Sequence, residues 1–339
     1  FLYLKGKKSM QIFLYTIILG SQLFDRMTSP YFPSFQKSLE GNNVAKIIIF
    51  GDQSSPHKKI LPKNFIYKQV SWKDISARLD SELGTKISSL YTNMTHSNYK
   101  INDFKTLIPM LYPGLFAEYN RTQTRLLGWI DNDMWFSTQL FRGLERKRKG
   151  KHITHWSGIP PNPAPMSWGP ITILDRDLYF KTLVPLVKSH VHLLLPVLMD
   201  PHEYRCYDEW GEVKWGGLGF QHSFSYILSK ADIITDFSFI GNALQTDVQC
   251  CTSDSPRDKS CQVVNPNDQS CGYCQMSWEN RKVVLRNYKN ETIYFCHFQR
   301  SKRSNPNMFS SNDLWQKYLS KLKKKRPIIS NILKGIHFE

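Results

Sequence analysis

Two carboxylates interrupt the apolar stretch Leu126-Leu-Gly-Trp-Ile-Asp131-Asn-Asp133-Met-Trp-Phe-Ser-Thr-Gln-Leu140. The apolar part predicts a buried strand that stops at the acidic residues. Because side chains alternate faces along a strand, we expect Asp131 and Asp133 to point the same way. Two convergent carboxylates repel each other unless a cation lies between them, and oxygen ligands favour Mg²⁺ or Mn²⁺. The stretch therefore predicts a metal site of the kind that holds a diphosphate leaving group.

A second Asp-x-Asp, Asp175-Arg-Asp177, requires a separate explanation. It follows a predicted short strand, Ser167 to Leu174, and opens a predicted amphipathic helix that extends to His190. Acidic residues at a helix start satisfy its exposed N–H groups and its dipole. We therefore predict that the second copy is a helix cap, and that the first copy is the metal site.

The composition is that of a folded, strongly basic protein. The chain has 339 residues, of which 41% are hydrophobic, and its formal net charge is +17. This excludes a disordered chain and leaves nucleic acid, an anionic membrane surface or an anionic substrate as partners. The positive charge gathers in Arg146 to Lys151 and in Lys321 to Arg326. Because no recognisable nucleic-acid module accompanies these runs, nucleic-acid binding is the alternative hypothesis.

Alternating strand and helix patterns predict an α/β fold. An apolar run rich in β-branched residues covers Ile12 to Leu19, and a second one, Ala45 to Phe50, is followed by Asp52. A helix pattern over Tyr31 to Leu39 lies between them, which together suggests a right-handed βαβ unit. A further helix is expected from Ser71, with Asp74 completing a capping box. We predict one mostly parallel central sheet flanked by helices, with a cysteine-rich irregular insertion.

The N-terminal apolar segment and the cysteines bear on localisation. Met10 to Phe24 is either a first core strand or part of a targeting segment, and it is short for a membrane span. Five of the seven cysteines fall between Cys250 and Cys274. They form either disulfides in an oxidising lumen or a zinc site built on Cys271 and Cys274. Disulfides would favour the secretory pathway and the Golgi lumen, and reduced cysteines the cytoplasm.

The order of motifs resembles a poorly characterised glycosyltransferase-like family of plants, algae and bacteria with a nucleotide-sugar-binding A-type (GT-A) fold. That family has a Lys-x-x-Asp-Phe-Lys segment, an acidic step at a strand end, a further strand, an Asp-Glu pair and an aromatic-His-Phe stretch. One departure is that the family's Trp-Gly before the acidic step is Gly128-Trp129 here. In this chain the motifs read as Lys100 to Lys105, Leu127 to Asp133, Ser167 to Leu174, Asp208 to Gly211 and Phe295 to Lys302.

The resemblance implies a set of binding residues. Asp131 and Asp133 would bind Mn²⁺ or Mg²⁺ on the diphosphate of a UDP- or GDP-linked sugar, and His297 would complete the metal site. The Lys-x-x-Asp-Phe-Lys segment would hold donor phosphate and sugar hydroxyls, although it also fits a solvated helix face. The further candidates for donor or acceptor contacts are Lys100, Asp103, Lys105, Asp52, Trp168, Gly169 and Lys302.

Asp208 and Glu209 are the candidate catalytic residues. They lie among Tyr207, Trp210 and Trp215, and aromatic faces beside carboxylates suit a sugar ring. In an inverting enzyme one carboxylate would take the proton of the acceptor hydroxyl. In a retaining enzyme it would position the substrates, and a loop carboxylate that caps a helix remains the structural alternative.

We therefore expect a metal-dependent glycosyltransferase that acts on a glycan, lipid or protein hydroxyl. A basic segment, residues 1–9, would precede a glycosyltransferase domain over residues 10–302, in which residues 245–280 form the cysteine-rich insertion. Residues 303–339 would form a basic helix and tail that could contact a membrane surface. The rival hypothesis is a non-catalytic basic protein that binds nucleic acid or anionic lipid, and a family member that has lost activity is a third.

Overall fold

The chain forms two compact units. Unit 1 comprises residues 1–20, 43–131 and 148–237, and unit 2 comprises residues 21–42, 132–147 and 238–339. The computed structural model describes residues 10–19, 35–36, 38–39, 45–52, 61–91, 100–117, 124–132, 134–148, 155–157, 167, 169–200, 205–209, 211, 213, 217–231, 233, 235–236, 275–279, 282–286 and 292–297.

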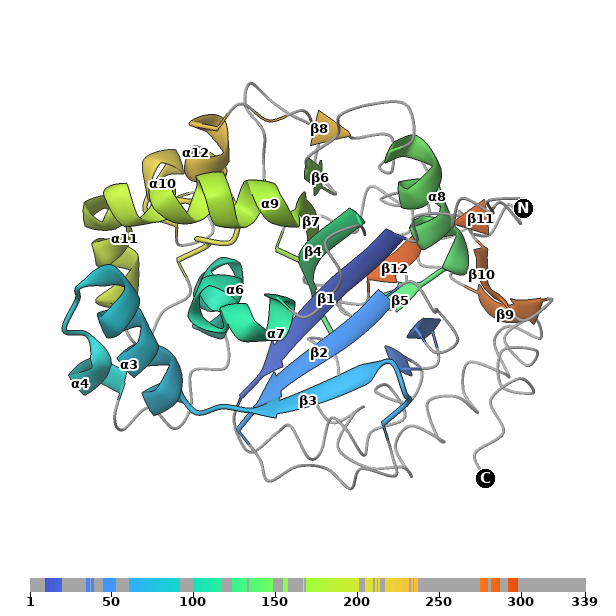
Figure 1. Ribbon diagram of the computed structural model, residues 1–339, viewed down its shortest axis with the longest axis horizontal. Coiled ribbons are helices and arrows are strands. Elements are labelled where there is room, and N and C mark those ends of the chain that lie inside the picture. Colours follow the sequence, from blue (N-terminus) through green and yellow to red (C-terminus); the bar gives the residue numbers. More distant parts are fainter. Residues whose placement is uncertain are drawn as a thin grey trace, which may run out of the picture. The chain divides into compact units, whose positions relative to one another are not determined.

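Unit 1 is built on a mixed, mostly parallel sheet (Figure 1). In its described part the strand order is β3-β2-β1-β4-β7-β6-β8, and β7 alone runs against the others. This confirms the predicted α/β class with a mostly parallel central sheet. The strands are β1 (Met10–Ile18), β2 (Ala45–Gly51), β3 (Phe65–Gln69), β4 (Thr124–Ile130), β6 (His155–Ser157), β7 (Ile171–Asp175) and β8 (Thr235–Asp236).

The central strands are buried on both faces, which explains their nearly continuous apolar sequences. In β1 the side chains of Phe13 and Tyr15 face the helices, whereas the alternate residues Ile12 and Leu14 are also buried. The register pairs Leu14 of β1 with Gly128 of β4. β4 ends at Ile130, so the predicted buried strand stops directly before Asp131.

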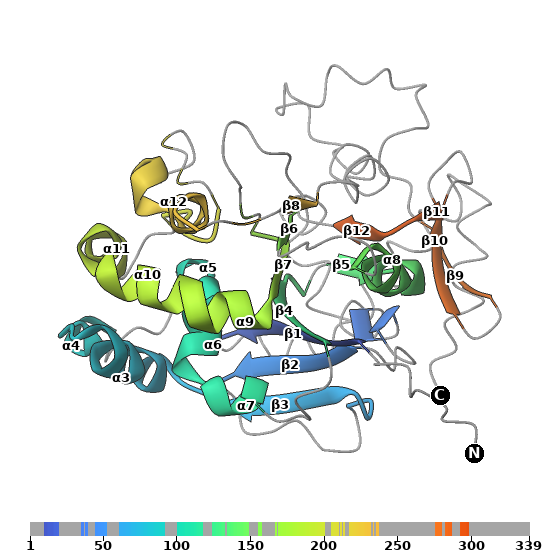
Figure 2. The same ribbon diagram turned by 45° about the horizontal axis from the view of Figure 1, so that its top comes forward.

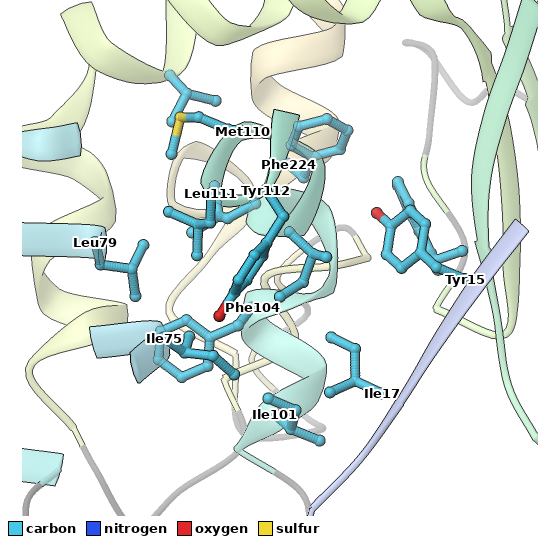
Figure 3. Packing of buried hydrophobic residues seen from close by; sticks show 14 of the residues in the cluster. Tyr15, Ile17, Ile75, Leu79, Ile101, Phe104, Met110, Leu111, Tyr112 and Phe224 are labelled. Carbon is cyan, nitrogen blue, oxygen red and sulfur yellow. The ribbon is translucent and has the colours of Figure 1, made fainter. Parts of the chain in front are cut away.

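Helices cover one face of this sheet (Figures 1 and 2) and share one apolar core with β1, β2 and β4. Figure 3 shows Tyr15 and Ile17 of β1 facing Phe104, Tyr112 and Phe224 across this core. The helices are α3 (Trp72–Leu83), α4 (Ser88–Tyr91), α5 (Ile101–Phe104), η1 (Lys105–Leu107), α6 (Ile108–Leu111), α7 (Pro113–Ala117), α9 (Arg176–Leu178), η2 (Tyr179–Leu183), α10 (Val184–Ser189), α11 (Val191–Leu198), η4 (Phe220–His222) and α12 (Phe224–Ser229).

The boundaries of α3 follow from its sequence. The Ser71 hydroxyl accepts a hydrogen bond from the Asp74 backbone N–H, and the Asp74 carboxylate accepts one from the Ser71 N–H, so the predicted capping box is confirmed. The helix ends at Gly84, whose positive φ of 67° favours glycine. Between these ends, Ile75 and Leu79 lie one helical turn apart and face the core.

Unit 2 contains two small sheets and α8 (Thr138–Arg148), whose last residue belongs to unit 1. One sheet pairs β5 (Met134–Phe136) with β12 (Phe295–His297), and the other has the order β11-β10-β9. The remaining strands are β9 (Gln275–Glu279), β10 (Lys282–Arg286) and β11 (Thr292–Ile293). β10 and β11 pair as an antiparallel hairpin, and the chain leaves it at Tyr294, after which β12 pairs with β5.

Several sequence expectations lie outside the described residues. They concern residues 1–9, the cysteine cluster from Cys250 to Cys274 and the tail 303–339. The alternatives of disulfides and zinc therefore stay predictions. No helix in the described ranges is both long and apolar enough for a membrane span.

The Asp80 carboxylate tests this account of the α3 end. It accepts hydrogen bonds from the Thr85 hydroxyl and the Ile87 N–H, both at 2.7 Å, and from the Ser88 N–H at 3.0 Å. Burial alone would raise the pKa of Asp80, but the hydrogen bonds from Ser88, Thr85 and Ile87 lower it below its ordinary value. We expect Asp80→Ala to lower the free energy of unfolding by about 1–3 kcal/mol at neutral pH, measured by urea denaturation.

Because the pKa of Asp80 is lower in the folded state, its contribution should be present above the ordinary aspartate pKa and lost as pH falls through the folded value. The matched control is Glu82→Ala, which removes an exposed ion pair to Lys188 of 2.8 Å and should cost less than about 1 kcal/mol. Equal effects of the two changes would contradict the account.

Candidate functional site

Acidic residues follow two parallel strands at one edge of the unit 1 sheet. β1, β2 and β4 run in the same direction, so their carboxyl ends share this edge. The sheet grows from β1 toward β2 on one side and toward β4 on the other, which makes a topological switch point where ligands bind in α/β folds. Asp52 directly follows β2 and Asp131 directly follows β4. The Asp131 N–H donates to the Pro170 carbonyl at 2.9 Å, so the start of β7 lies at the same edge.

The Lys105 ammonium lies among oxygen atoms at this edge. Its Nζ is 2.5 Å from Asp131 Oδ1, 3.2 Å from the Gly169 carbonyl oxygen and 3.4 Å from Asp208 Oδ2. The Lys105 side chain is 6% exposed, whereas that of Asp131 is 25% exposed. Burial alone would lower the pKa of Lys105, but the Asp131 and Asp208 carboxylates raise it above its ordinary value. Lys105 is therefore a fixed positive charge at all physiological pH values.

A break in the helix between residues 100 and 117 places Lys105. The helical stretch is divided into α5, η1 and α6. Pro109 has no N–H for the Lys105 carbonyl four residues earlier, and the Ile108 N–H donates to that carbonyl. The Tyr15 hydroxyl of β1 donates to that carbonyl at 2.7 Å. The Tyr179 hydroxyl likewise donates to the neighbouring Thr106 carbonyl at 2.6 Å. Two buried tyrosines therefore fix the backbone from which the lysine side chain extends.

Asp208 and Glu209 reach the same edge from a turn about 80 residues farther along the chain. The Asp208 side chain is 1% exposed, whereas Glu209 is partly buried. Burial raises the pKa of Asp208 well above its ordinary value, and the carboxylates of Glu209, Asp103 and Asp131 raise it further, against the opposing effect of Lys105. Of the two candidate catalytic residues, Glu209 is therefore the one that a ligand can reach in this structure.

The turn that carries these two carboxylates is held at its backbone. The Glu209 carbonyl accepts hydrogen bonds from the hydroxyls of Ser225 and Ser167, at 2.6 and 3.0 Å. At the start of the turn, Cys206 is buried and has a positive φ of 56°, a conformation that costs a non-glycine residue about 1–3 kcal/mol. The surrounding contacts therefore maintain a strained backbone at the candidate site.

Lys100 and Asp103 form a fully buried ion pair of 2.9 Å behind this turn. Asp103 also accepts hydrogen bonds from the backbone N–H groups of Arg205 and Tyr207, both at 3.0 Å, and Lys100 donates to the Val197 carbonyl. The family resemblance predicts that these side chains contact donor phosphate or sugar hydroxyls, and the structure corrects this. In this structure neither is exposed to a ligand, because their charges and hydrogen bonds are used to hold the turn before Asp208.

Two glycines allow close backbone contacts at the site. A Cβ atom on Gly169 would lie 2.7 Å from Glu209 Oε1 and 2.8 Å from Asp208 Oδ2. A Cβ atom on Gly128 would lie 2.3 Å from the Thr172 carbonyl oxygen, so β4 and β7 pack together only with glycine there. The unusual order Gly128-Trp129 is thus explained by packing, because Trp129 is fully buried and its ring contacts Phe224 edge to face.

The second Asp-x-Asp is a helix cap, as predicted. Asp175 Oδ1 accepts hydrogen bonds from the N–H groups of Asp177 and Leu178, at 2.8 and 3.3 Å. Because β7 is antiparallel to β4 and pairs Asp175 with Leu126, this carboxylate lies at the opposite edge of the sheet from Asp131. Asp177 forms an exposed ion pair with Lys181.

The remaining predicted site residues are described partly or not at all. Asp133, Trp168 and Lys302 lie outside the described residues. The backbone of His297 is described, and β12 pairs it with Met134, the residue that follows Asp133 in the chain. Within the described part of the chain, no group of three or more His, Cys, Asp or Glu side chains is arranged to hold a metal ion.

The sequence did not predict the buried residues that hold the backbone of the site in place. Tyr15, Ser167 and Ser225 hold backbone carbonyls, and the Arg205 N–H binds Asp103. One signal was present in the sequence, because Tyr15 places a hydroxyl in a strand that is otherwise almost wholly apolar. The two serines carry no comparable signal.

No family model matches the chain, and no curated protein matches it. Among the solved structures that match is the apo form of mouse xyloside xylosyltransferase 1. It is 11% identical, with a TM-score of 0.41, and the match covers 72% of this chain and 88% of that one. The chemistry of the site is therefore inferred from its own residues.

Gly169 provides a test of the site geometry. We expect Gly169→Ala to displace Asp208 or Glu209 and to lower the free energy of unfolding by about 1–3 kcal/mol, because the new methyl group overpacks a buried contact. Gly114→Ala is the matched control, since a Cβ atom there meets nothing within 4 Å. In helix α7 it should be neutral or stabilising by up to about 1 kcal/mol. Equal stability of the two variants in denaturant would contradict the described packing.

Asp208→Asn tests whether the pKa of Asp208 is raised in the folded protein. Because the pKa of Asp208 is raised in the folded state, its ionisation costs folding free energy, and wild-type stability falls as pH rises from the unfolded pKa through the folded one. The asparagine variant lacks this loss, so its stability relative to wild type should increase as pH rises from 4 to 8. If the stability of the variant relative to wild type instead decreases as pH rises, the ion pair with Lys105 outweighs the cost of burial. The assignment of a raised pKa to Asp208 is then wrong.

Proposed function

We propose that this protein is a metal-dependent glycosyltransferase that moves a sugar from a nucleotide-sugar donor to a hydroxyl acceptor. The proposal is carried by one observation: Lys105, Asp131 and Asp208 come from three distant segments and converge at the carboxyl edge of a mostly parallel sheet. The ordered motifs that resemble a glycosyltransferase-like family add independent support. The edge combines negative charge for a metal ion with positive charge for phosphate.

The donor set suits a hard divalent cation. Three oxygen atoms already surround a cation here, the Lys105 ammonium, and Asp131 is the most exposed of the charged groups that contact it. Asp133 and His297 are proposed as the further ligands. Bound Mn²⁺ or Mg²⁺ would supply positive charge that stabilises the leaving diphosphate.

Other residues would bind the donor. The Lys105 ammonium is a point charge that can contact a phosphate oxygen. Asp52, which follows β2, would accept a hydrogen bond from a nucleoside hydroxyl, since an acidic residue at such an edge commonly accepts from a ribose. Lys302 is proposed as a further phosphate contact. The donor would be UDP- or GDP-linked.

The acceptor would lie on the side of Glu209 and Gly169. Glu209 is only partly buried, so its carboxylate can accept a hydrogen bond from an acceptor hydroxyl. Asp208 would keep Lys105 and Glu209 in place, and Lys100 with Asp103 would keep the turn in place. Trp168 is proposed as an apolar surface for a sugar ring. The acceptor is a glycan, lipid or protein hydroxyl, in an inverting or a retaining reaction.

The two Asp-x-Asp copies provide a test within one chain. We expect Mn²⁺ to increase the affinity for UDP or GDP by about tenfold or more, and we expect Asp131→Asn/Asp133→Asn to abolish that increase. Asp175→Asn/Asp177→Asn is the matched control, and it should bind as wild type does because asparagine also caps helices. Isothermal titration with each nucleotide, with and without Mn²⁺, measures the affinities, and a screen of nucleotide-sugar hydrolysis with Mn²⁺ then identifies the donor.

The outcomes separate the hypotheses. Nucleotide binding that survives the first double change unaltered would refute the metal site. A basic binding protein would instead bind nucleic acid or anionic vesicles in a salt-sensitive manner that both double variants retain. Metal-dependent nucleotide binding without hydrolysis or transfer of any sugar tested would indicate an inactive member.

A further inference from the structure

We infer that the Lys105 ammonium is a counter-ion lock on the metal position: it neutralises Asp131 until a divalent ion enters, and the entering ion releases it toward the donor diphosphate. This inference rests on the proposed function and deepens it, because it assigns a regulated order of binding to the same site. It concerns unit 1 residues alone, namely Lys105, Asp131, Gly169 and Asp208.

The geometry of the lysine is that of a bound cation. The Lys105 Nζ is 2.5 Å from one Asp131 oxygen, a short charge-assisted contact, and 3.2 and 3.4 Å from the Gly169 and Asp208 oxygens. The Lys105 side chain is almost completely buried, so this is a solvent-shielded contact. In the state described, the carboxylate that would bind the metal therefore holds an internal cation.

A divalent ion and the ammonium compete for the same carboxylate. A divalent ion carries twice the charge of the ammonium, so the two cations repel each other in this partly buried site. A metal ion on Asp131 would thus push Lys105 away, and Lys105 in place would weaken metal binding. The lock and the metal oppose each other electrostatically.

The proposed movement involves the side chain of Lys105 and not its backbone. Its backbone is fixed, because the Tyr15 hydroxyl binds its carbonyl and Pro109 sets the helix break. Its four-carbon side chain is flexible, and Asp208 Oδ2 lies 3.4 Å from the ammonium. In the proposed exchange, rotation of the side chain moves the ammonium from Asp131 to an oxygen of the arriving phosphate.

Binding of metal and nucleotide would then be coupled. Metal entry frees the ammonium, the freed ammonium binds the diphosphate, and the diphosphate in turn removes the competitor of the metal. By linkage, each ligand must increase the affinity for the other by the same factor. The lock would also lower the affinity for a metal ion when the nucleotide-sugar donor is absent.

Two substitutions that act in opposite directions test the lock. Lys105→Met removes the charge, and we expect Mn²⁺ alone to bind about tenfold or more tightly, whereas UDP and GDP bind more weakly in the presence of Mn²⁺. Lys105→Arg keeps the charge and offers a planar fork that suits a carboxylate, so Mn²⁺ should bind several-fold, about three- to tenfold, more weakly. Electron paramagnetic resonance of free Mn²⁺ gives these affinities without any need for activity.

Controls assign the effects to this position. Lys181→Met removes an ammonium from the exposed pair with Asp177, and it should leave Mn²⁺ affinity unchanged. Asp131→Asn, alone and combined with Lys105→Met, should abolish Mn²⁺ binding. Lys105→Arg retains the charge balance of the buried site, so it remains informative if Lys105→Met fails to fold.

The results distinguish the lock from the function on which it rests. If Mn²⁺ binds wild type and both Lys105 variants with equal affinity, the lock is refuted while the metal-dependent function stands. If Mn²⁺ binds none of them, both are refuted. Tight binding to Lys105→Met, with weak binding to wild type and weaker binding to Lys105→Arg, would establish the lock.

Discussion

The contact between the Lys105 ammonium and the Asp131 carboxylate is the constraint on which the rest of the candidate site depends. It brings together the segment after β4 and the broken helix, and the Gly169 carbonyl and Asp208 complete the oxygen surroundings of the same nitrogen. Without Lys105, less positive charge would offset the three acidic side chains that converge at one edge. Burial and the neighbouring carboxylates already raise the pKa of Asp208. One positive charge thus allows an acidic edge to exist in the folded state.

Buried residues hold the backbone segments that carry Lys105 and Asp208. Pro109 has no N–H for the Lys105 carbonyl, which accepts hydrogen bonds from the Ile108 N–H and the Tyr15 hydroxyl, so the lysine side chain extends from a fixed backbone. On the other side, Asp103 binds two backbone N–H groups of the turn before Asp208, and Lys100 balances its charge. These are positioning contacts, since neither side chain of the Lys100–Asp103 pair is exposed. The site therefore consists of a few exposed groups supported by a larger buried polar network.

Much of the scaffold followed from sequence, because burial on both faces of parallel strands leaves continuous apolar runs such as those of β1 and β4. The helix cap at Asp175 was predicted for the same kind of local reason. Contacts across long separations could not be obtained in this way. Lys100 and Asp103 were expected at the donor because charged residues are rarely buried, yet the cost of burial is offset by a mutual ion pair. The turn at Asp208 is equally non-local, since its hydrogen bonds come from residues 16 to 104 positions away.

The central claim is that this edge holds a divalent ion and a nucleoside diphosphate in exchange for the internal ammonium. A crystal structure of the protein soaked with Mn²⁺ and UDP or GDP tests it most directly. The account predicts a manganese anomalous signal at an Asp131 oxygen, the diphosphate at the same edge, and the Lys105 Nζ moved from Asp131 to a phosphate oxygen. A nucleotide bound elsewhere, with the Lys105–Asp131 contact intact and no manganese at Asp131, would contradict it.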